Sequence, residues 1–244
     1  MWIMRNYLRF TGVLQLTMIS LGCSWGGAGS ASPGAPPKEP PSSQATDPSH
    51  ISHPAAQSGA LNPEGEGARV AIFAGGCFWC IEAGLEKLKG VKKAISGYTG
   101  GESPNPTYAQ VSSSQSDHLE AVWVEFDPQV ISYRQLIEAF WRNIDPTQRD
   151  GQFADRGPQY LTAIFYVSEA QRLTAARSRE ALAKSGRFKD PIYTPLREAG
   201  LFWPAEAYHQ DYYKKNAAHY RRYHEGSGRG PFIRRYWGAA PTAP

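Results

Sequence analysis

Cysteine and methionine are both scarce in this chain of 244 residues, which has three of each. The cysteines are Cys23, Cys77 and Cys80, so there is no second close pair to complete a four-cysteine zinc site. The histidines lack the spacing of metal ligands, and we expect no metal. All the methionines lie within the first 18 residues, so the rest of the chain lacks the side chain most easily oxidised to a sulfoxide.

The net charge is small, at +4 for 26 Lys and Arg against 22 Asp and Glu. A nucleic-acid-binding domain usually carries a larger and more clustered excess, so we expect no nucleic-acid partner. Seven basic residues do gather between Lys214 and Arg235. A solvated face is the favoured interpretation of this cluster, ahead of a phosphate or membrane patch.

No apolar run is long enough to cross a bilayer. The run 10–21 has about the length of the apolar part of a signal peptide, and Arg5 and Arg9 precede it. We therefore expect residues 1–23 to be a signal peptide and the protein to be exported to the bacterial cell envelope.

The signal ends in Ser20-Leu-Gly-Cys23, which resembles the processing site of bacterial lipoproteins, where the cysteine is acylated. Ser20 departs from the aliphatic residue which that pattern prefers. Cleavage near 28–32 is the alternative and would leave a soluble exported protein. We expect lipidation of Cys23 to be the protein's contact with a membrane.

Composition divides the remainder of the chain. Residues 24–68 are rich in Pro, Gly and Ser, cannot bury enough apolar surface to offset their ordering entropy, and are predicted to be a disordered tether. Residues 69–238 are predicted to form one catalytic domain, followed by a disordered tail at 239–244. We expect a monomer.

Alternating strands and helices predict an α/β domain with long loops. Ser132 and Ser168 are candidate N-caps. The remainder after the last long helix is expected to be irregular and rich in aromatic residues. The predicted strands are 69–75, 91–98, 119–126 and 160–167, the predicted helices are 77–88, 132–142, 169–184 and a short one near 205–213, and the long loops are 99–107 and 144–158.

Gly-Cys-Phe-Trp-Cys at 76–80 follows a buried strand and opens a helix. Unpaired N–H groups and the helix dipole at that position favour a thiolate, so Cys77 is predicted to be an ionised nucleophile. Cys80 lies one turn further on and is close enough to form a disulfide. A structural disulfide across so short a loop would add little stability, so a redox-active pair is the favoured interpretation.

Seven motifs occur in order between Val70 and Tyr213. They are Ala-Gly-Gly-Cys-Phe-Trp-Cys (74–80), Gly-Tyr-Thr-Gly-Gly (97–101), Pro-Asn-Pro-Thr-Tyr (104–108), His-Leu-Glu-Ala-Val (118–122), Asp-Pro-Thr-Gln (145–148), Asp-Arg-Gly-Pro-Gln-Tyr (155–160) and Ala-Glu-Ala-Tyr-His-Gln-Asp-Tyr (205–212). In this order they resemble the A-type peptide methionine sulfoxide reductases.

The resemblance implies a two-layer α/β roll with a mixed sheet. It also implies a reaction: the S epimer of methionine sulfoxide, in peptides and as the free amino acid, is reduced to methionine without a metal or organic cofactor. Oxidised proteins would be the substrates, and a thioredoxin-like protein would restore the enzyme.

The resemblance assigns roles to individual residues. Cys77 would attack the sulfoxide sulfur, and Glu120 would protonate the sulfoxide oxygen, for which burial on an apolar strand should raise its pKa. Tyr108 and Tyr160 would donate hydrogen bonds to that oxygen. Asp155 would orient the site, although a turn residue before Gly-Pro has the same appearance.

Phe78 and Trp79 would form the apolar wall for the substrate methyl group, since sulfur and methyl groups pack well on aromatic faces. Many relatives have Gly at the position of Cys80 and carry resolving cysteines in a C-terminal tail. No cysteine follows Cys80 here. The resemblance therefore implies that Cys80 condenses with a sulfenic acid on Cys77.

Two other functions remain open. A thiol-disulfide oxidoreductase of the thioredoxin type also places Cys-x-x-Cys at a helix start, but its Trp precedes the first cysteine and it would leave the Tyr, Glu and Asp motifs unexplained. A non-enzymatic envelope lipoprotein with a structural disulfide is the third interpretation.

Overall fold

The structure is a computed structural model that describes residues 69–238. The predictions for residues 1–68, which include the signal peptide, the Cys23 anchor and the tether, lie outside the described residues, as does the predicted tail at 239–244. Within the described part, no helix combines the length and the apolar character that crossing a membrane requires.

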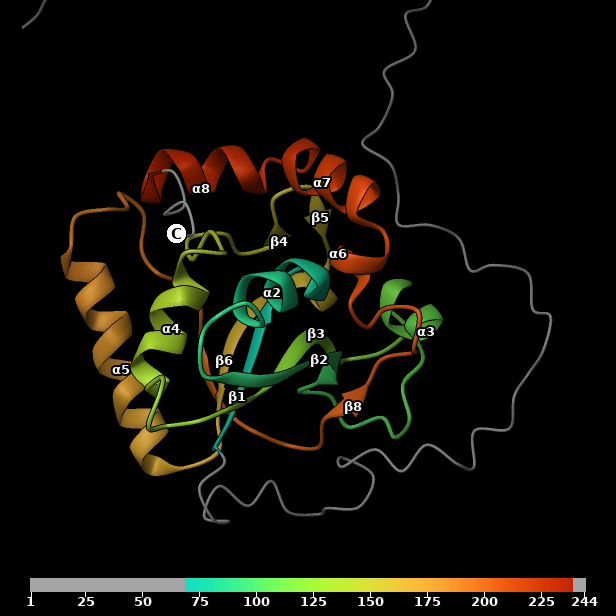
Figure 1. Cartoon of the computed structure of the whole chain (residues 1–244), viewed down its shortest axis with the longest axis horizontal. Helices are drawn as coiled ribbons and strands as arrows, with labels where there is room; N and C mark the ends of the chain where they lie inside the picture. Colours follow the sequence, from blue (N-terminus) through green and yellow to red (C-terminus); the bar gives the residue numbers. More distant parts are fainter. Residues whose placement is uncertain (1–68, 239–244) are drawn as a thin grey trace, which may run out of the picture. The chain divides into compact units, whose positions relative to one another are not determined.

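A six-stranded sheet lies at the centre of the domain, in the order β7-β6-β1-β3-β2-β8 (Figure 1). Neighbouring strands are antiparallel except for β6 and β7, which are parallel, so the predicted mixed sheet is confirmed. The bounds are β1 Arg69–Gly75, β2 Val91–Thr99, β3 Leu119–Phe126, β6 Thr162–Tyr166, β7 Leu196–Glu198 and β8 Trp203–Pro204.

The central strand β1 is apolar on both faces, as its sequence requires. Phe73 belongs to a core cluster shared with α2 (Phe78–Leu85) and α4 (Tyr133–Trp141), whereas Ile72 belongs to a smaller cluster under Phe202. Successive side chains of a strand point to opposite faces, so β1 contributes to both clusters. The helices α2 and α4 therefore cover one face of the sheet, and an irregular segment covers the other.

Two helices begin at the predicted caps. The Ser132 hydroxyl accepts from the backbone N–H of Gln135 at the start of α4, and the Ser168 hydroxyl caps α5 (Glu169–Lys184) in the same way. The capping box at Thr107, which starts α3 (Tyr108–Ser112), was not predicted. That box fixes Tyr108 at the first position of its helix.

Two predicted elements are shorter in the structure. Helix α2 begins at Phe78, with Cys77 as its N-cap, and ends at Leu85 rather than at residue 88. The predicted strand 160–167 is β6, and the 3-10 helix η2 (Pro158–Tyr160) precedes it. A short hairpin, β4 (Gly151–Gln152) and β5 (Asp155–Arg156), lies within the predicted long loop.

The prediction of an irregular C-terminal segment holds for residues 185–211, apart from β7 and β8, and is wrong beyond them. Three helices follow one another there, namely α6 (Tyr212–Lys215), α7 (Ala217–Gly226) and α8 (Arg229–Trp237), and the helix predicted near 205–213 starts only at Tyr212 (Figure 1). The inward residues of these helices are mostly aromatic and are interleaved with Lys and Arg. An aliphatic repeat, the usual sign of an amphipathic helix, is therefore weak in this segment.

Candidate active site

A glycine turn between β1 and α2 sets the position of Cys77. Gly76 has a φ of +73°, and a Cβ built there would lie 2.5 Å from the Cβ of Gln152. Only glycine adopts this conformation without strain and leaves that space free. The turn thus places Cys77 at the N-cap of α2, where its side chain is 5% exposed.

Eight side chains from distant parts of the chain line a small pocket. Seven of them are residues that the sequence predicted for the site, and Tyr223 of α7 is the eighth. Cys80 does not line the pocket. The lining residues are Cys77, Phe78, Trp79, Tyr108, Glu120, Asp155, Tyr160 and Tyr223.

Glu120 lies on β3 and is 2% exposed. One carboxylate oxygen, Oε2, accepts a hydrogen bond from the backbone N–H of Phe78 at 3.0 Å. Burial is the main reason why the pKa of Glu120 is raised to about 8, and nearby Asp155 and Cys80 add to it. The carboxyl group is therefore mostly protonated at neutral pH and can donate a proton inside the pocket.

Tyr108 and Tyr160 bring two hydroxyl groups to the same pocket. Burial, followed by the charge of Glu120, raises the pKa of both phenols well above the usual range. They therefore keep their protons and remain hydrogen-bond donors at neutral pH. Two uncharged donors beside a protonated carboxyl group suit an oxygen that gains negative charge.

Trp79 is held rigidly in the pocket wall. Its ring stacks on Tyr212 with the centroids 3.8 Å apart and 8° between the planes, and its Nε1–H donates to Nδ1 of His209 at 3.1 Å. Burial lowers the pKa of His209 to about 3, so the ring is neutral and can accept this bond. Phe78 packs at 4.9 Å from the same histidine ring.

Asp155 is oriented by a residue that the sequence did not indicate. The hydroxyl of Tyr223 donates a short hydrogen bond to Oδ2 of Asp155. Burial raises the pKa of Asp155, while the bond from Tyr223 and the charge of Arg229 act in the opposite direction. This pair connects the β5 side of the pocket to α7.

The charge on the two cysteines differs from the prediction. Both sulfurs are unbridged, and the thiols of Cys77 and Cys80 are hydrogen-bonded to each other. Burial, with Cys80, Glu120 and Asp155 nearby, raises the pKa of Cys77 well above its ordinary value. The expectation that Cys77 is ionised at the helix N-terminus is therefore not met in this reduced state, in which desolvation is the largest influence on its pKa.

The pKa of Cys80 moves the other way. Burial alone would raise it, but the hydrogen bond with Cys77, the charge of Arg229 and a hydrogen bond with Tyr220 together lower it. The two thiols titrate as a pair, and their mutual hydrogen bond favours a negative charge on Cys80. The sulfur of Cys80 is then an acceptor for the remaining proton on Cys77.

A family model described as peptide methionine sulfoxide reductase matches residues 69–241. Peptide methionine sulfoxide reductase MsrA of Bacillus subtilis (strain 168) is 52% identical over 174 residues, which are 71% of this chain and 98% of that protein. The enzyme of the same name from Listeria innocua is 49% identical over 172 residues, covering 70% of this chain and 97% of that protein.

Solved structures agree with this match. Mxr1 from Saccharomyces cerevisiae in reduced form has a TM-score of 0.58 and 31% identity, and the likeness covers 62% of this chain and 86% of that one. Methionine sulfoxide reductase A of Corynebacterium diphtheriae has a TM-score of 0.55 and 30% identity over 63% of this chain and 77% of that one. The chain belongs to the peptide methionine sulfoxide reductase family.

Three residues of this reductase near the cysteines were missed from the sequence: Tyr220 and Tyr223 on α7, and Arg229 on α8. The basic cluster 214–235 was predicted to be solvated, and six of its members are exposed, but Arg229 is only 1% exposed. Tyr220 and Tyr223 are three residues apart. This spacing was the sequence signal that both lie on the same inward face of a helix.

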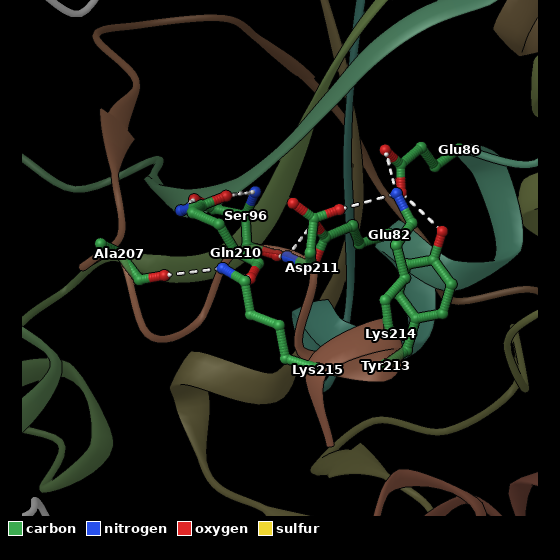
Figure 2. Close-up of polar contacts among 9 residues, drawn as sticks. All are labelled: Glu82, Glu86, Ser96, Ala207, Gln210, Asp211, Tyr213, Lys214 and Lys215. Carbon is green, nitrogen blue, oxygen red and sulfur yellow. Dashed lines mark hydrogen bonds and ion pairs between the residues drawn. The ribbon is translucent and has the colours of Figure 1, made fainter. Parts of the chain in front are cut away.

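One group of carboxylates in the described part of the reductase has the proximity of a cation site. Ligand oxygens of Glu82, Glu86 and Asp211 lie within 4.8 Å of one another. As Figure 2 shows, the ammonium group of Lys214 donates to both Glu86 and Asp211, so the protein supplies its own cation. Glu82 accepts from Ser96 and from the backbone N–H of Asp211, which ties α2 to β2 and to the start of α6.

Proposed function

We propose that this reductase acts on the S epimer of methionine sulfoxide in peptides, through a sulfenic acid on Cys77 that Cys80 resolves. Reduction of peptide methionine sulfoxide is the reaction of its family. The observation that carries the proposal is the convergence of one sulfur, one protonated carboxyl group and two phenols on a pocket with an aromatic wall.

In the first step, the sulfur of Cys77 attacks the sulfoxide sulfur while Glu120 gives its proton to the oxygen. Tyr108 and Tyr160 donate hydrogen bonds to that oxygen as its charge grows. The hydroxyl then moves to the Cys77 sulfur as its bond to the substrate sulfur breaks. The bond between the two sulfurs breaks as well, so methionine leaves and Cys77 becomes a sulfenic acid. The proton of Cys77 passes to the sulfur of Cys80, with which it is hydrogen-bonded.

In the second step, the sulfur of Cys80 attacks the sulfur of Cys77. A disulfide bond forms, the bond from Cys77 to its hydroxyl oxygen breaks, and water leaves with the proton that Cys80 has given up. A thioredoxin-like dithiol then reduces the disulfide by thiol–disulfide exchange. Atoms and electrons balance, since one dithiol is oxidised for each sulfoxide reduced.

A simple thiol-disulfide oxidoreductase accounts for less of the pocket. Exchange between disulfides needs neither a buried carboxylic acid of raised pKa nor a pair of phenols beside the first sulfur. The carboxylic acid and the phenols suit a substrate that carries an oxygen atom, such as a sulfoxide. The thioredoxin-type alternative is therefore not favoured.

A chiral assay tests the reaction. The purified chain is given separate S and R sulfoxides of a methionine peptide, together with a dithiol, and the methionine formed is measured. We expect loss of the S form alone. Loss of the R form alone, or of neither form, would refute the proposal, and insulin reduction without sulfoxide turnover would favour the alternative.

The resolving role has its own test in Cys80→Ala. We expect this variant to release one equivalent of methionine per chain and then to stall when thioredoxin is the reductant. Continued turnover with thioredoxin would show that Cys80 is not required.

We also propose that the protein is exported, acts as a monomer and is anchored in the bacterial envelope by a lipid on Cys23. The support for export and for the anchor is the sequence 10–23 alone. Metabolic labelling with a lipid analogue tests it, and label that persists in Cys23→Ala would contradict it. Velocity sedimentation of the purified domain tests the monomer.

A further inference from the structure

Arg229 is a fully buried guanidinium group at the turn that precedes Cys77. It is 1% exposed, and it reaches across from α8 to donate hydrogen bonds to the backbone carbonyls of Gly75, at 3.0 Å, and Asn143. Its guanidinium carbon lies 4.6 Å from the centre of the Phe153 ring. No carboxylate lies within ion-pair distance of it among the described residues.

Burying a cation without a partner anion costs free energy, so some group around Arg229 must offset that cost. Burial would lower the pKa of Arg229, yet that pKa is raised, and the largest contribution in that direction is the charge of Cys80. Tyr223, Cys77 and Asp155 contribute less. Cys80 is the strongest candidate for the missing anion.

A second group, from a different helix, forms a hydrogen bond with the Cys80 sulfur. Tyr220 on α7 is hydrogen-bonded to Cys80 through its hydroxyl group, and its own pKa lies far above the usual range, so it acts as a donor. The acids that face this sulfur are Asp155 on β5 and Glu120 on β3. Both would oppose a negative charge on Cys80, and Glu120 is neutral at physiological pH.

We propose that Arg229 and Tyr220 hold Cys80 as a thiolate, and so make it the attacking group toward the Cys77 sulfenic acid and the leaving group when a reductant opens the disulfide. Neither touches the substrate, and both are positioning residues that act through Cys80. The inference rests on the proposed resolving role of Cys80.

The negative charge on Cys80 serves in two steps, resolution of the sulfenic acid and reduction of the disulfide. In resolution, Cys80 gives up the proton that it took from Cys77, and its thiolate forms a bond to the Cys77 sulfur. The sulfur–oxygen bond of the sulfenic acid breaks, and the hydroxyl leaves with that proton as water. In reduction, an external thiolate bonds to Cys77, the disulfide breaks, and the electron pair returns to Cys80. A thiol of lower pKa leaves faster in such an exchange, so a cation beside Cys80 helps this step too.

The direct test is a titration of Cys80 in the full chain. With Cys23→Ser and Cys77→Ser in every variant, Cys80 is the one remaining thiol, and its ionisation is followed by the ultraviolet absorbance of the thiolate. Adding Arg229→Gln should raise its pKa by about one to three units, since an opposite charge is removed. Tyr220→Phe should raise it by a smaller amount.

Two further variants separate an electrostatic role from a structural one. Asp155→Asn removes a negative charge that faces Cys80 and should lower the pKa of Cys80, opposite to the effect of Arg229→Gln. Arg234→Gln is the matched control on the same helix, because Arg234 is exposed and pairs with Glu225. It should leave the titration unchanged.

A kinetic readout uses both active-site cysteines. After one turnover, disulfide formation should be slower in Arg229→Gln, and its pH profile should move to higher pH, while Arg229→Lys should restore part of the rate. An unshifted Cys80 pKa in folded Arg229→Gln would overturn the inference, and so would an unshifted pKa in Tyr220→Phe if Arg229→Gln does not fold. Failure of the proposed function is recognised separately, by continued turnover of Cys80→Ala with thioredoxin.

Discussion

Glu120 shows how one buried residue limits the pH range of the enzyme. Its carboxyl group must be protonated to give a proton to the sulfoxide oxygen, and burial keeps it so up to a pH of about 8. The hydrogen bond from Phe78 favours the charged form and limits the shift. The same N–H holds the carboxyl group toward Cys77, so position and acidity are set together.

Glu120→Gln tests this role. The amide cannot donate an acidic proton, so we expect the single-turnover rate of methionine formation to fall by about 100-fold to 10,000-fold. The wild-type rate should decline as the pH rises through about 8, because the required acid form is lost there. The variant should lack this decline. A similar rate in the variant, or the same high-pH limb, would mean that another group supplies the proton.

The sequence indicates the residues whose atoms react and misses those that act through their environment. Cys77, Glu120 and the phenols lie within recognisable motifs, and all reach the pocket. The raised pKa of Cys77 and the buried charge of Arg229 depend on desolvation by helices far along the chain. No local pattern reveals how deeply a single arginine in a basic segment will be buried.

At the scale of elements, α2 is the helix on which the site is built, and all eight of its residues are buried. One of them is Glu82, whose side chain joins α2 to Ser96 on β2 and to the backbone of Asp211 (Figure 2). Burial raises the pKa of Glu82 to about 7, even though both hydrogen bonds favour the charged form. Folding therefore favours the protonated side chain.

Glu82→Gln makes the coupling between folding and protonation of Glu82 measurable. In the unfolded chain this carboxyl group titrates near the ordinary pKa of a glutamate, whereas in the folded chain its pKa is about 7. Its contribution to stability is therefore complete below the unfolded pKa and is lost as the pH rises through about 7. Relative to the variant, the wild type should lose about 3 kcal/mol of unfolding free energy between about pH 4 and pH 9. Urea unfolding at several pH values measures the difference.

Other groups titrate in both proteins and cancel in that comparison. Glu120 contributes in the same direction as Glu82, while neutral His209 contributes stability that is lost as the pH falls. Glu138→Gln, on the exposed side of α4, is the matched control for loss of a surface carboxylate. A constant difference between wild type and Glu82→Gln across the pH range would contradict the raised pKa.

The sequence predicted elements where caps and apolar repeats coincide. Helix α5 spans the predicted residues, and strands β1 and β3 do as well. Prediction from the sequence failed at α7 and α8, whose partly buried hydrophobic residues are aromatic and whose stability comes from packing against the rest of the domain. Those helices carry Tyr220, Tyr223 and Arg229, so the missed elements and the missed residues have one cause.

At the scale of the molecule, the active site depends on sheet order and on the C-terminal helices. Strand β1 lies between β3 and β6, which brings Cys77 at its end beside Glu120 of β3. Sequence patterns do not give this order, because an apolar strand can pair with several partners. The α/β class was therefore predictable from the pattern, whereas the arrangement of the pocket required the structure or the resemblance.

Helix α8 closes the domain with aromatic contacts. Phe232 packs on Phe153 and on Phe188, at centroid distances of 5.3 and 6.2 Å, and Tyr236 stacks on Phe188 at 5.0 Å. Together with Arg229, these contacts join α8 to the β4–β5 hairpin region and to the segment after α5. We infer that residues 69–238 form the stable catalytic unit and that α8 belongs to it.

Two truncations test that boundary. The chain 69–238 should unfold at the same urea concentration as the full chain and keep its activity on a methionine sulfoxide peptide, because the family match lies in 69–241.

The chain 69–227 lacks α8, exposes Phe153 and Phe188, and should lose about 3 kcal/mol or more of unfolding free energy. Its thioredoxin-dependent turnover should fall further than stability explains, since Arg229 is absent. Full activity without α8 would separate that helix from catalysis, and an inactive 69–238 would place part of the site outside these residues.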